Sequence, residues 1–113
     1  MSESFTVWVG LPDGKVRSFE VGAEEYILGA ARRAGLYLPS VCEQGWCISC
    51  AARIVTGEVD QSDSRRYYEQ DREARFALLC TAKARTDVHF VSHQSVALRQ
   101  HRDAWGLPAP RGT

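Results

Sequence analysis

Four cysteines at a fixed spacing constrain this 113-residue chain more than any other feature. Three lie within nine residues and the fourth follows much later, in the pattern Cys42-x4-Cys47-x2-Cys50-x29-Cys80. Four thiols could in principle form two disulfides by three pairings. The first 20 residues, however, lack the basic start and apolar run of a secretory signal, so an oxidising compartment is unsupported. We therefore expect a protein of a reducing compartment, whose thiols are available as metal ligands.

The spacing matches that of the cysteine ligands of a [2Fe-2S] cluster. One loop can wrap three thiolates around a compact cluster, while the fourth arrives from a separate strand and ties the loop to the core. Residues 40–49 have no regular period, so their backbone N–H groups can donate to sulfur, and Gly45 permits a strained turn. We predict that one [2Fe-2S] cluster per chain is held by Cys42, Cys47, Cys50 and Cys80.

Other cysteine chemistries fit this spacing less well. A structural zinc site usually pairs two CxxC knuckles, and only Cys47 and Cys50 form one here, so zinc is disfavoured although it stays open. A Rieske centre would need histidine ligands, and the three histidines have no cysteine partner at close spacing. A thioredoxin-like dithiol belongs at a helix start, whereas this CxxC lies between a loop and a strand.

The apolar pattern predicts a single α+β domain. Alternation predicts a β-hairpin over 5–9 and 16–21 around the turn at Pro12, Asp13 and Gly14. Helical spacing over 24–34, with acids first and Gly35 as a stop, predicts a helix. Further along, the pattern predicts a strand over 51–59 with a turn at Gly57, a helix over 67–76, strands over 77–80 and 88–91, and a terminal helix over 96–101.

Charge and hydropathy exclude several classes of partner. Lys plus Arg equals Asp plus Glu at 14 each, so no net field draws the chain to nucleic acid or to a membrane surface. No stretch approaches the roughly 18 to 20 apolar residues of a membrane span. No nucleophilic triad or phosphate-binding glycine loop is recognisable, so we expect no catalysis by the chain itself. His89 and His93 are given no role.

The residues around the cysteines resemble those of plant-type and cyanobacterial [2Fe-2S] ferredoxins. The resemblance runs from about Phe5 to Leu98 and is strongest in VCEQGWCISCAARIVTGEVDQSD and LLCTAKARTDVHFVSH. It implies a β-grasp fold, a mixed sheet packed on one main helix, over a domain of residues 1–98. It also implies that Cys42 and Cys47 bind the iron nearer the surface and that Cys50 and Cys80 bind the inner one. The implied activity is one-electron transfer from photosystem I or a reductase to other redox enzymes.

The chain departs from the family pattern beside the cluster and on the docking surface. Glu43 replaces a positive charge, and Trp46 and Ile48 are bulky, which together favour a low potential unless these side chains point outwards. The acidic docking residues of the family are largely missing, so we expect weaker steering towards the usual reductase and a specialised partner. Tyr67 or Tyr68 could replace the family's docking aromatic, or could simply pack.

Three functional hypotheses remain open from sequence: a diffusible electron carrier, the dedicated electron-feeding component of an oxygenase system, and a cluster-based redox regulator. For each we expect a monomer that meets redox partner proteins in a bacterial cytoplasm or a plastid stroma. Residues 99–113 form a C-terminal extension in which Trp105 and Leu107 are apolar. This extension either caps the fold, touches a partner or is flexible.

Overall fold

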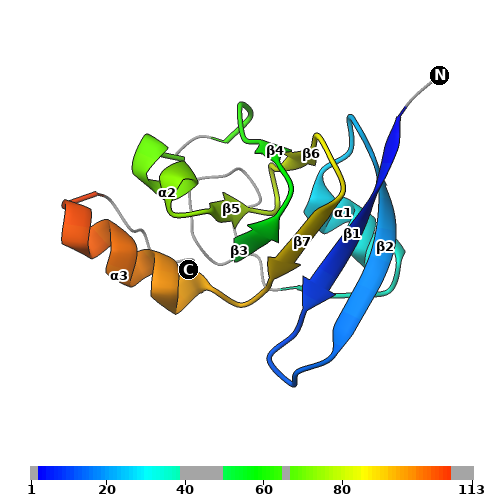
Figure 1. Cartoon of the computed structure of the whole chain (residues 1–113), viewed down its shortest axis with the longest axis horizontal. Helices are drawn as coiled ribbons and strands as arrows, with labels where there is room; N and C mark the ends of the chain where they lie inside the picture. Colours follow the sequence, from blue (N-terminus) through cyan, green and yellow to red (C-terminus); the bar gives the residue numbers. More distant parts are fainter. Residues whose placement is uncertain (1–2, 39–49, 65–66, 108–113) are drawn as a thin grey trace.

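A mixed five-stranded sheet organises the computed structural model, which describes residues 3–38, 50–64 and 67–107. The strand order is β2-β1-β7-β3-β5; β1 and β7 run parallel and the other neighbours antiparallel (Figure 1). The strands are β1 (Ser4–Gly10), β2 (Val16–Gly22), β3 (Ala51–Thr56), β5 (Phe76–Leu78) and β7 (Val88–Val91). A second, two-stranded sheet pairs β4 (Val59–Asp60) with β6 (Lys83–Ala84).

The core lies between the large sheet and helix α1 (Ile27–Arg33). Alternate residues of β1 and β7, among them Val7, Val9 and Phe90, are fully buried, and Ile27 and Leu28 of α1 are buried as well. The predicted hairpin and the predicted helix are therefore confirmed. The helix begins at residue 27 rather than 24, because the backbone before it is extended and forms a bridge with β6.

The other two helices each end just before a residue whose φ angle is positive. Helix α2 (Glu69–Glu73) is shorter than the predicted 67–76, since Arg75 adopts a φ of 69° and the chain then enters β5. Helix α3 (Ser95–Trp105) is longer than the predicted 96–101, and it ends at Gly106, whose φ of 68° suits a glycine. The predicted strand over 88–91 is confirmed, whereas β6 was not predicted.

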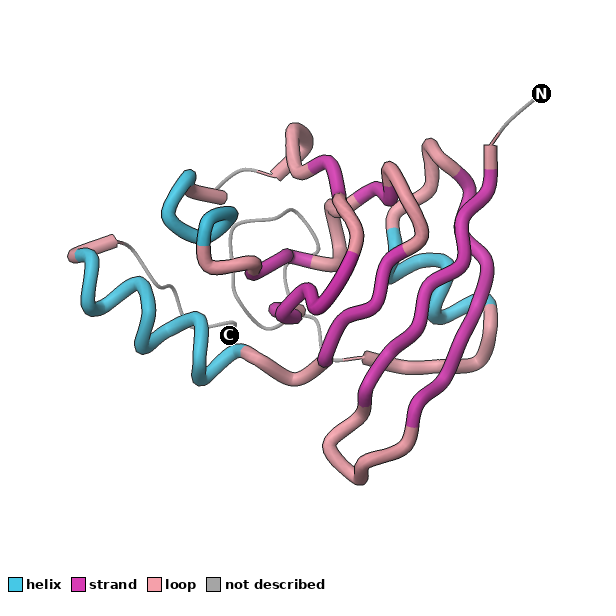
Figure 2. The backbone as a smooth tube through the Cα atoms, viewed as in Figure 1, coloured by secondary structure: helices cyan, strands magenta, loops and turns pink. Residues whose placement is uncertain are grey.

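Helix α3 lies at the end of the molecule opposite the β1–β2 hairpin (Figure 2). Its Leu98 and Arg102 side chains are buried, so the helix packs on the rest of the domain. The helix continues across residue 98, the predicted end of the domain. Within the described residues no helix is long and apolar enough to cross a membrane.

Candidate metal centre

Two of the four predicted ligands, Cys50 and Cys80, meet inside the protein. Cys50 directly precedes β3 and is 2% exposed, whereas Cys80 follows β5 by two residues and is 5% exposed. Antiparallel pairing of Ala51 with Leu78 sets the two strands in register. As a result, the two Sγ atoms lie 3.3 Å apart.

This sulfur pair suits a shared metal ion. A disulfide would bring the sulfurs to about 2.05 Å, so the observed separation excludes one between Cys50 and Cys80. Two thiolates on one tetrahedral ion, with metal–sulfur distances of about 2.3 Å, lie about 3.8 Å apart, which is within about 0.5 Å of the observed separation. Tetrahedral sulfur coordination is typical of zinc and of the irons of Fe–S clusters. Cys50 and Cys80 therefore fit the pair of thiolates that would hold one iron of the cluster.

The backbone on either side of Cys80 is fixed by helix α1. The first N–H groups of an α-helix have no partner within the helix. Here the N–H of Ile27 donates to the carbonyl of Ala82 at 2.9 Å, and that of Leu28 donates to Leu79 at 3.0 Å. From the other side, the Leu79 N–H donates to the Cys50 carbonyl at 3.3 Å. These contacts hold the Cys80 segment between α1 and β3.

The other two predicted ligands, Cys42 and Cys47, lie outside the described residues, as do Glu43, Trp46 and Ile48. The predicted effects of these three side chains on the cluster stay predictions. Among the residues that the structure describes, no group of three or more His, Cys, Asp or Glu side chains could hold a metal ion.

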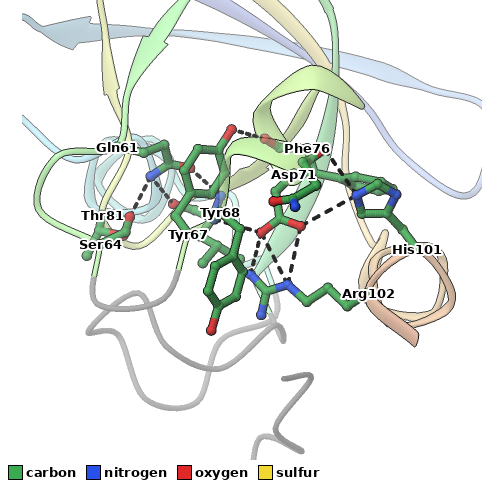
Figure 3. Close-up of polar contacts among 11 residues, drawn as sticks. Gln61, Ser64, Tyr67, Tyr68, Asp71, Phe76, Thr81, His101 and Arg102 are labelled. Atoms are coloured by element: carbon green, nitrogen blue, oxygen red, sulfur yellow. Dashed lines mark hydrogen bonds and ion pairs between the residues drawn. The ribbon is translucent and has the colours of Figure 1, made fainter. Parts of the chain in front are cut away.

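A network of neutral side chains, which sequence reasoning did not find, joins Gln61 to Ser64 and Thr81 (Figure 3). The Gln61 amide donates to Ser64 Oγ at 2.8 Å, and Ser64 Oγ lies 2.6 Å from Thr81 Oγ1. Thr81 Oγ1 in turn lies 4.0 Å from the Sγ of Cys80. Nothing in the local sequence indicates these contacts, because Ser64 and Thr81 are 17 residues apart.

A buried ion pair joins α2 to α3, also unforeseen from the sequence (Figure 3). Arg102 and Asp71 are both fully buried, and Arg102 Nη2 donates to Asp71 Oδ2 at 2.8 Å. The Tyr68 N–H donates to the same oxygen at 3.1 Å, and the Arg102 guanidinium lies 5.0 Å from the Tyr68 ring centre. His101 Nε2 donates to the Gln70 carbonyl at 3.1 Å.

An exposed group of charges surrounds Tyr26 at the start of α1. The Tyr26 hydroxyl donates to Asp63 at 2.7 Å, and Lys83 Nζ lies 3.2 Å from the same carboxylate. The hydrogen bond from Tyr26, followed by the interactions with Lys83, lowers the pKa of Asp63. Hydrogen bonds to Asp63 raise the pKa of Tyr26 and the pKa of Lys83, so all three groups keep their ordinary charge near pH 7.

The aromatic and histidine candidates have local partners. The Tyr67 hydroxyl donates to the Phe76 carbonyl at 2.6 Å, and burial raises the pKa of Tyr67, so the hydroxyl stays neutral. Tyr68 precedes α2 and lies against Arg102. His89 is in β7, whereas His93 follows the end of that strand with a φ of 60°.

Comparison with known proteins identifies the class of this domain. A family model described as a 2Fe-2S iron-sulfur cluster binding domain matches residues 11–85. Ferredoxin-2 of Synechococcus sp. is 36% identical over 81 residues, which cover 72% of this chain and 77% of that protein. Chloroplastic ferredoxin-6 of Zea mays is 36% identical over 83 residues, covering 74% of this chain and 54% of the maize protein.

A solved structure carries the same fold as part of a larger protein. The Amycolatopsis cytochrome P450 reductase GcoB superposes with a TM-score of 0.70 at 30% identity, over 79% of this chain and 26% of that one. The chain thus spans about a quarter of the reductase and about half of the maize ferredoxin.

The fold and the sequence matches together define a β-grasp domain that binds a [2Fe-2S] cluster. The chain belongs to the plant-type [2Fe-2S] ferredoxin family. It is a [2Fe-2S] electron carrier, and members of its family carry a single cluster. Its partners are redox proteins.

Proposed function

We propose that Cys42, Cys47, Cys50 and Cys80 hold one [2Fe-2S] cluster and that the protein delivers single electrons from photosystem I or a reductase to a specialised redox enzyme. The observation that carries this proposal is the buried pair of Cys50 and Cys80 sulfurs, 3.3 Å apart and fixed by α1 and β3. When bound, the cluster supplies the one-electron chemistry. The chain's own residues fix the thiolates, exclude water and present a docking surface, and no substrate is altered by the protein itself.

The ligand assignment is tested by purifying the protein without air and counting iron and acid-labile sulfide. We expect two of each per chain, a visible spectrum that bleaches with dithionite and a rhombic EPR signal in the reduced state. Cys80→Ser should lose or strongly destabilise the cluster, because a ligand fixed by the core is removed. Ser18→Ala, at an exposed site in β2, is the control and should load normally. An unchanged spectrum in the Cys80 variant would refute its role as a ligand.

A second candidate is the dedicated electron-feeding component of an oxygenase system. It is favoured by the similarity to the P450 reductase and by the zero net charge, which differs from the acidic surface expected of the common carriers. The exposed arginines suit an acidic partner. Electron transfer to such a partner should slow as ionic strength rises, since charges of opposite sign are screened. A rate that increases with salt would exclude an acidic partner.

We further propose that the protein acts as a monomer in a bacterial cytoplasm or a plastid stroma. Its relatives come from a cyanobacterium and a chloroplast, which supports these two compartments. Light scattering of the purified protein at micromolar concentration tests the monomer, and a mass twice that of the chain would refute it.

A further inference from the structure

The Thr81 hydroxyl lies beside the proposed metal centre, between the sulfur of Cys80 and a second hydroxyl. Its Oγ1 is 4.0 Å from the Cys80 Sγ and 2.6 Å from Ser64 Oγ. Thr81 and Cys80 are each 5% exposed, so bulk water does not compete strongly for these contacts. In such surroundings the direction in which each hydroxyl donates its proton has a large electrostatic effect.

The orientation of the Gln61 amide determines where this chain of donors begins. The backbone N–H of Leu78 donates to Gln61 Oε1 at 2.6 Å, which fixes the oxygen and nitrogen of the amide. The Gln61 nitrogen then donates to the Leu78 carbonyl at 3.3 Å and to Ser64 Oγ at 2.8 Å. An amide nitrogen can only donate, so Ser64 Oγ must accept this hydrogen bond.

The remaining hydroxyl protons complete a chain that leads to the cysteine. With Ser64 accepting from Gln61, the cooperative arrangement has Ser64 donating to Thr81. Thr81 then has its own proton available for the neighbouring sulfur. A metal-bound cysteine is a thiolate with no proton, so at Cys80 it can only accept. Once a metal is bound, Thr81 is therefore the donor and Cys80 the acceptor in this contact.

We propose that Gln61, Ser64 and Thr81 form a hydrogen-bond chain that donates to the Cys80 thiolate and raises the reduction potential of the bound cluster. The inference rests on the proposed role of Cys80 as a ligand. A donor to a ligand sulfur favours the more negative, reduced state, because it stabilises the added charge. Thr81 is a positioning and tuning residue: it contacts the ligand and does not itself carry the electron.

The test compares Thr81→Val, which keeps the side-chain shape but removes the hydroxyl, with Thr81→Ser, which keeps the hydroxyl. We expect Thr81→Val to make reduction of the loaded protein about three- to tenfold less favourable, tenfold being about 59 mV for one electron. Thr81→Ser should stay close to wild type. The matched control is Thr6→Val, in β1, three strands and about 14 Å from β5. It should leave the potential unchanged.

A second readout separates donation to sulfur from a merely structural role. Fe–S(Cys) stretching frequencies, measured by resonance Raman, should shift on transfer of the wild type to D2O, and this shift should weaken in Thr81→Val. A Thr81→Val protein that loads two irons with the wild-type potential and the wild-type D2O shift would overturn the proposal.

Ser64→Ala covers the case in which Thr81→Val does not hold a cluster. It keeps the Thr81 hydroxyl but interrupts the chain, so a smaller fall in potential supports the proposal and an unchanged potential overturns it. Iron and sulfide counts on the wild type test the ligand assignment separately. A wild type without two of each would refute the proposed function and, with it, the thiolate acceptor that this inference needs.

Discussion

Two polar networks flank the short strand β5, and they differ in charge. At its end, Gln61 pairs with the backbone of Leu78 through neutral hydrogen bonds beside Cys80. At its start, the ring of Phe76 lies 5.4 Å from that of His101, next to the fully buried pair of Asp71 and Arg102. The neutral network can donate to Cys80, the proposed ligand, without adding a charge near it. The charged pair, in contrast, fixes the C-terminal helix to the domain. The proposed tuning of the cluster and the attachment of the C-terminal helix thus fall to different side chains.

The largest effect is expected when the charged network is broken. Arg102→Met leaves Asp71 buried without its ion-pair partner, so the free energy of unfolding should fall by about 3–5 kcal/mol. Chemical unfolding followed by circular dichroism measures this. Arg17→Met, at an exposed site in β2, should change the stability by less than about 0.5 kcal/mol.

A double variant sharpens this result. Asp71→Asn combined with Arg102→Met leaves neither charge buried, so its loss of stability should be smaller than the sum of the two single losses. Additive losses would show that the two side chains do not stabilise each other.

The neutral network should cost less to break. Gln61→Met keeps the length of the side chain but leaves the Leu78 N–H without its acceptor, at an expected cost of about 1–3 kcal/mol. The same unfolding measurement applies. A loss as large as that of Arg102→Met would contradict the ranking of the two networks.

Tyr67 lies between the two networks, and its hydroxyl should contribute less to the free energy of unfolding than either of them. Tyr67→Phe removes the hydroxyl that donates to Phe76 but keeps the ring, so we expect a loss of about 1 kcal/mol. Electron transfer rates to a partner give a second measurement. An unchanged stability with a much slower rate would assign Tyr67 to docking rather than to packing.

The smallest effect is expected at the exposed cluster of Tyr26, Asp63 and Lys83. The pKa of Asp63 is lower in the folded state than its ordinary value of 3.8, so folding favours its ionised form. Its contribution is present above that value and is lost as the pH falls through the lowered pKa. The difference in stability between wild type and Asp63→Asn should therefore shrink from pH 6 to pH 3. A difference that grows in acid would show the opposite sign of shift.

The sequence predicted those features that depend on local pattern or fixed covalent spacing. The strand over 88–91 followed from alternation of apolar residues, and the cysteine pattern brought Cys50 and Cys80 to the same site across a separation of 30 residues. Both signals are strong because few other structures share the two-residue period of a strand or the ligand spacing of a metal site.

Features that depend on tertiary contacts were not predictable. Arginine is rarely buried, so nothing indicated that Arg102 of α3 would be fully buried in an ion pair with Asp71 of α2. The early end of α2 depends on the positive φ of Arg75. The guanidinium of Arg75 donates to the carbonyl of Gly57, 18 residues earlier, at 2.7 Å. Strand β6 has only two residues, too few for any periodicity.

The position of β7 has a consequence for how the chain folds during synthesis. This strand is late in the sequence, yet it lies between β1 and β3 and joins two otherwise separate pairs, β2-β1 and β3-β5. All four cysteines precede it, so every proposed ligand has been synthesised before the sheet can close. A nascent chain halted before residue 88 would have a complete set of thiols but two unjoined halves of a sheet. The order of synthesis therefore completes the set of thiols before the strand that closes the sheet.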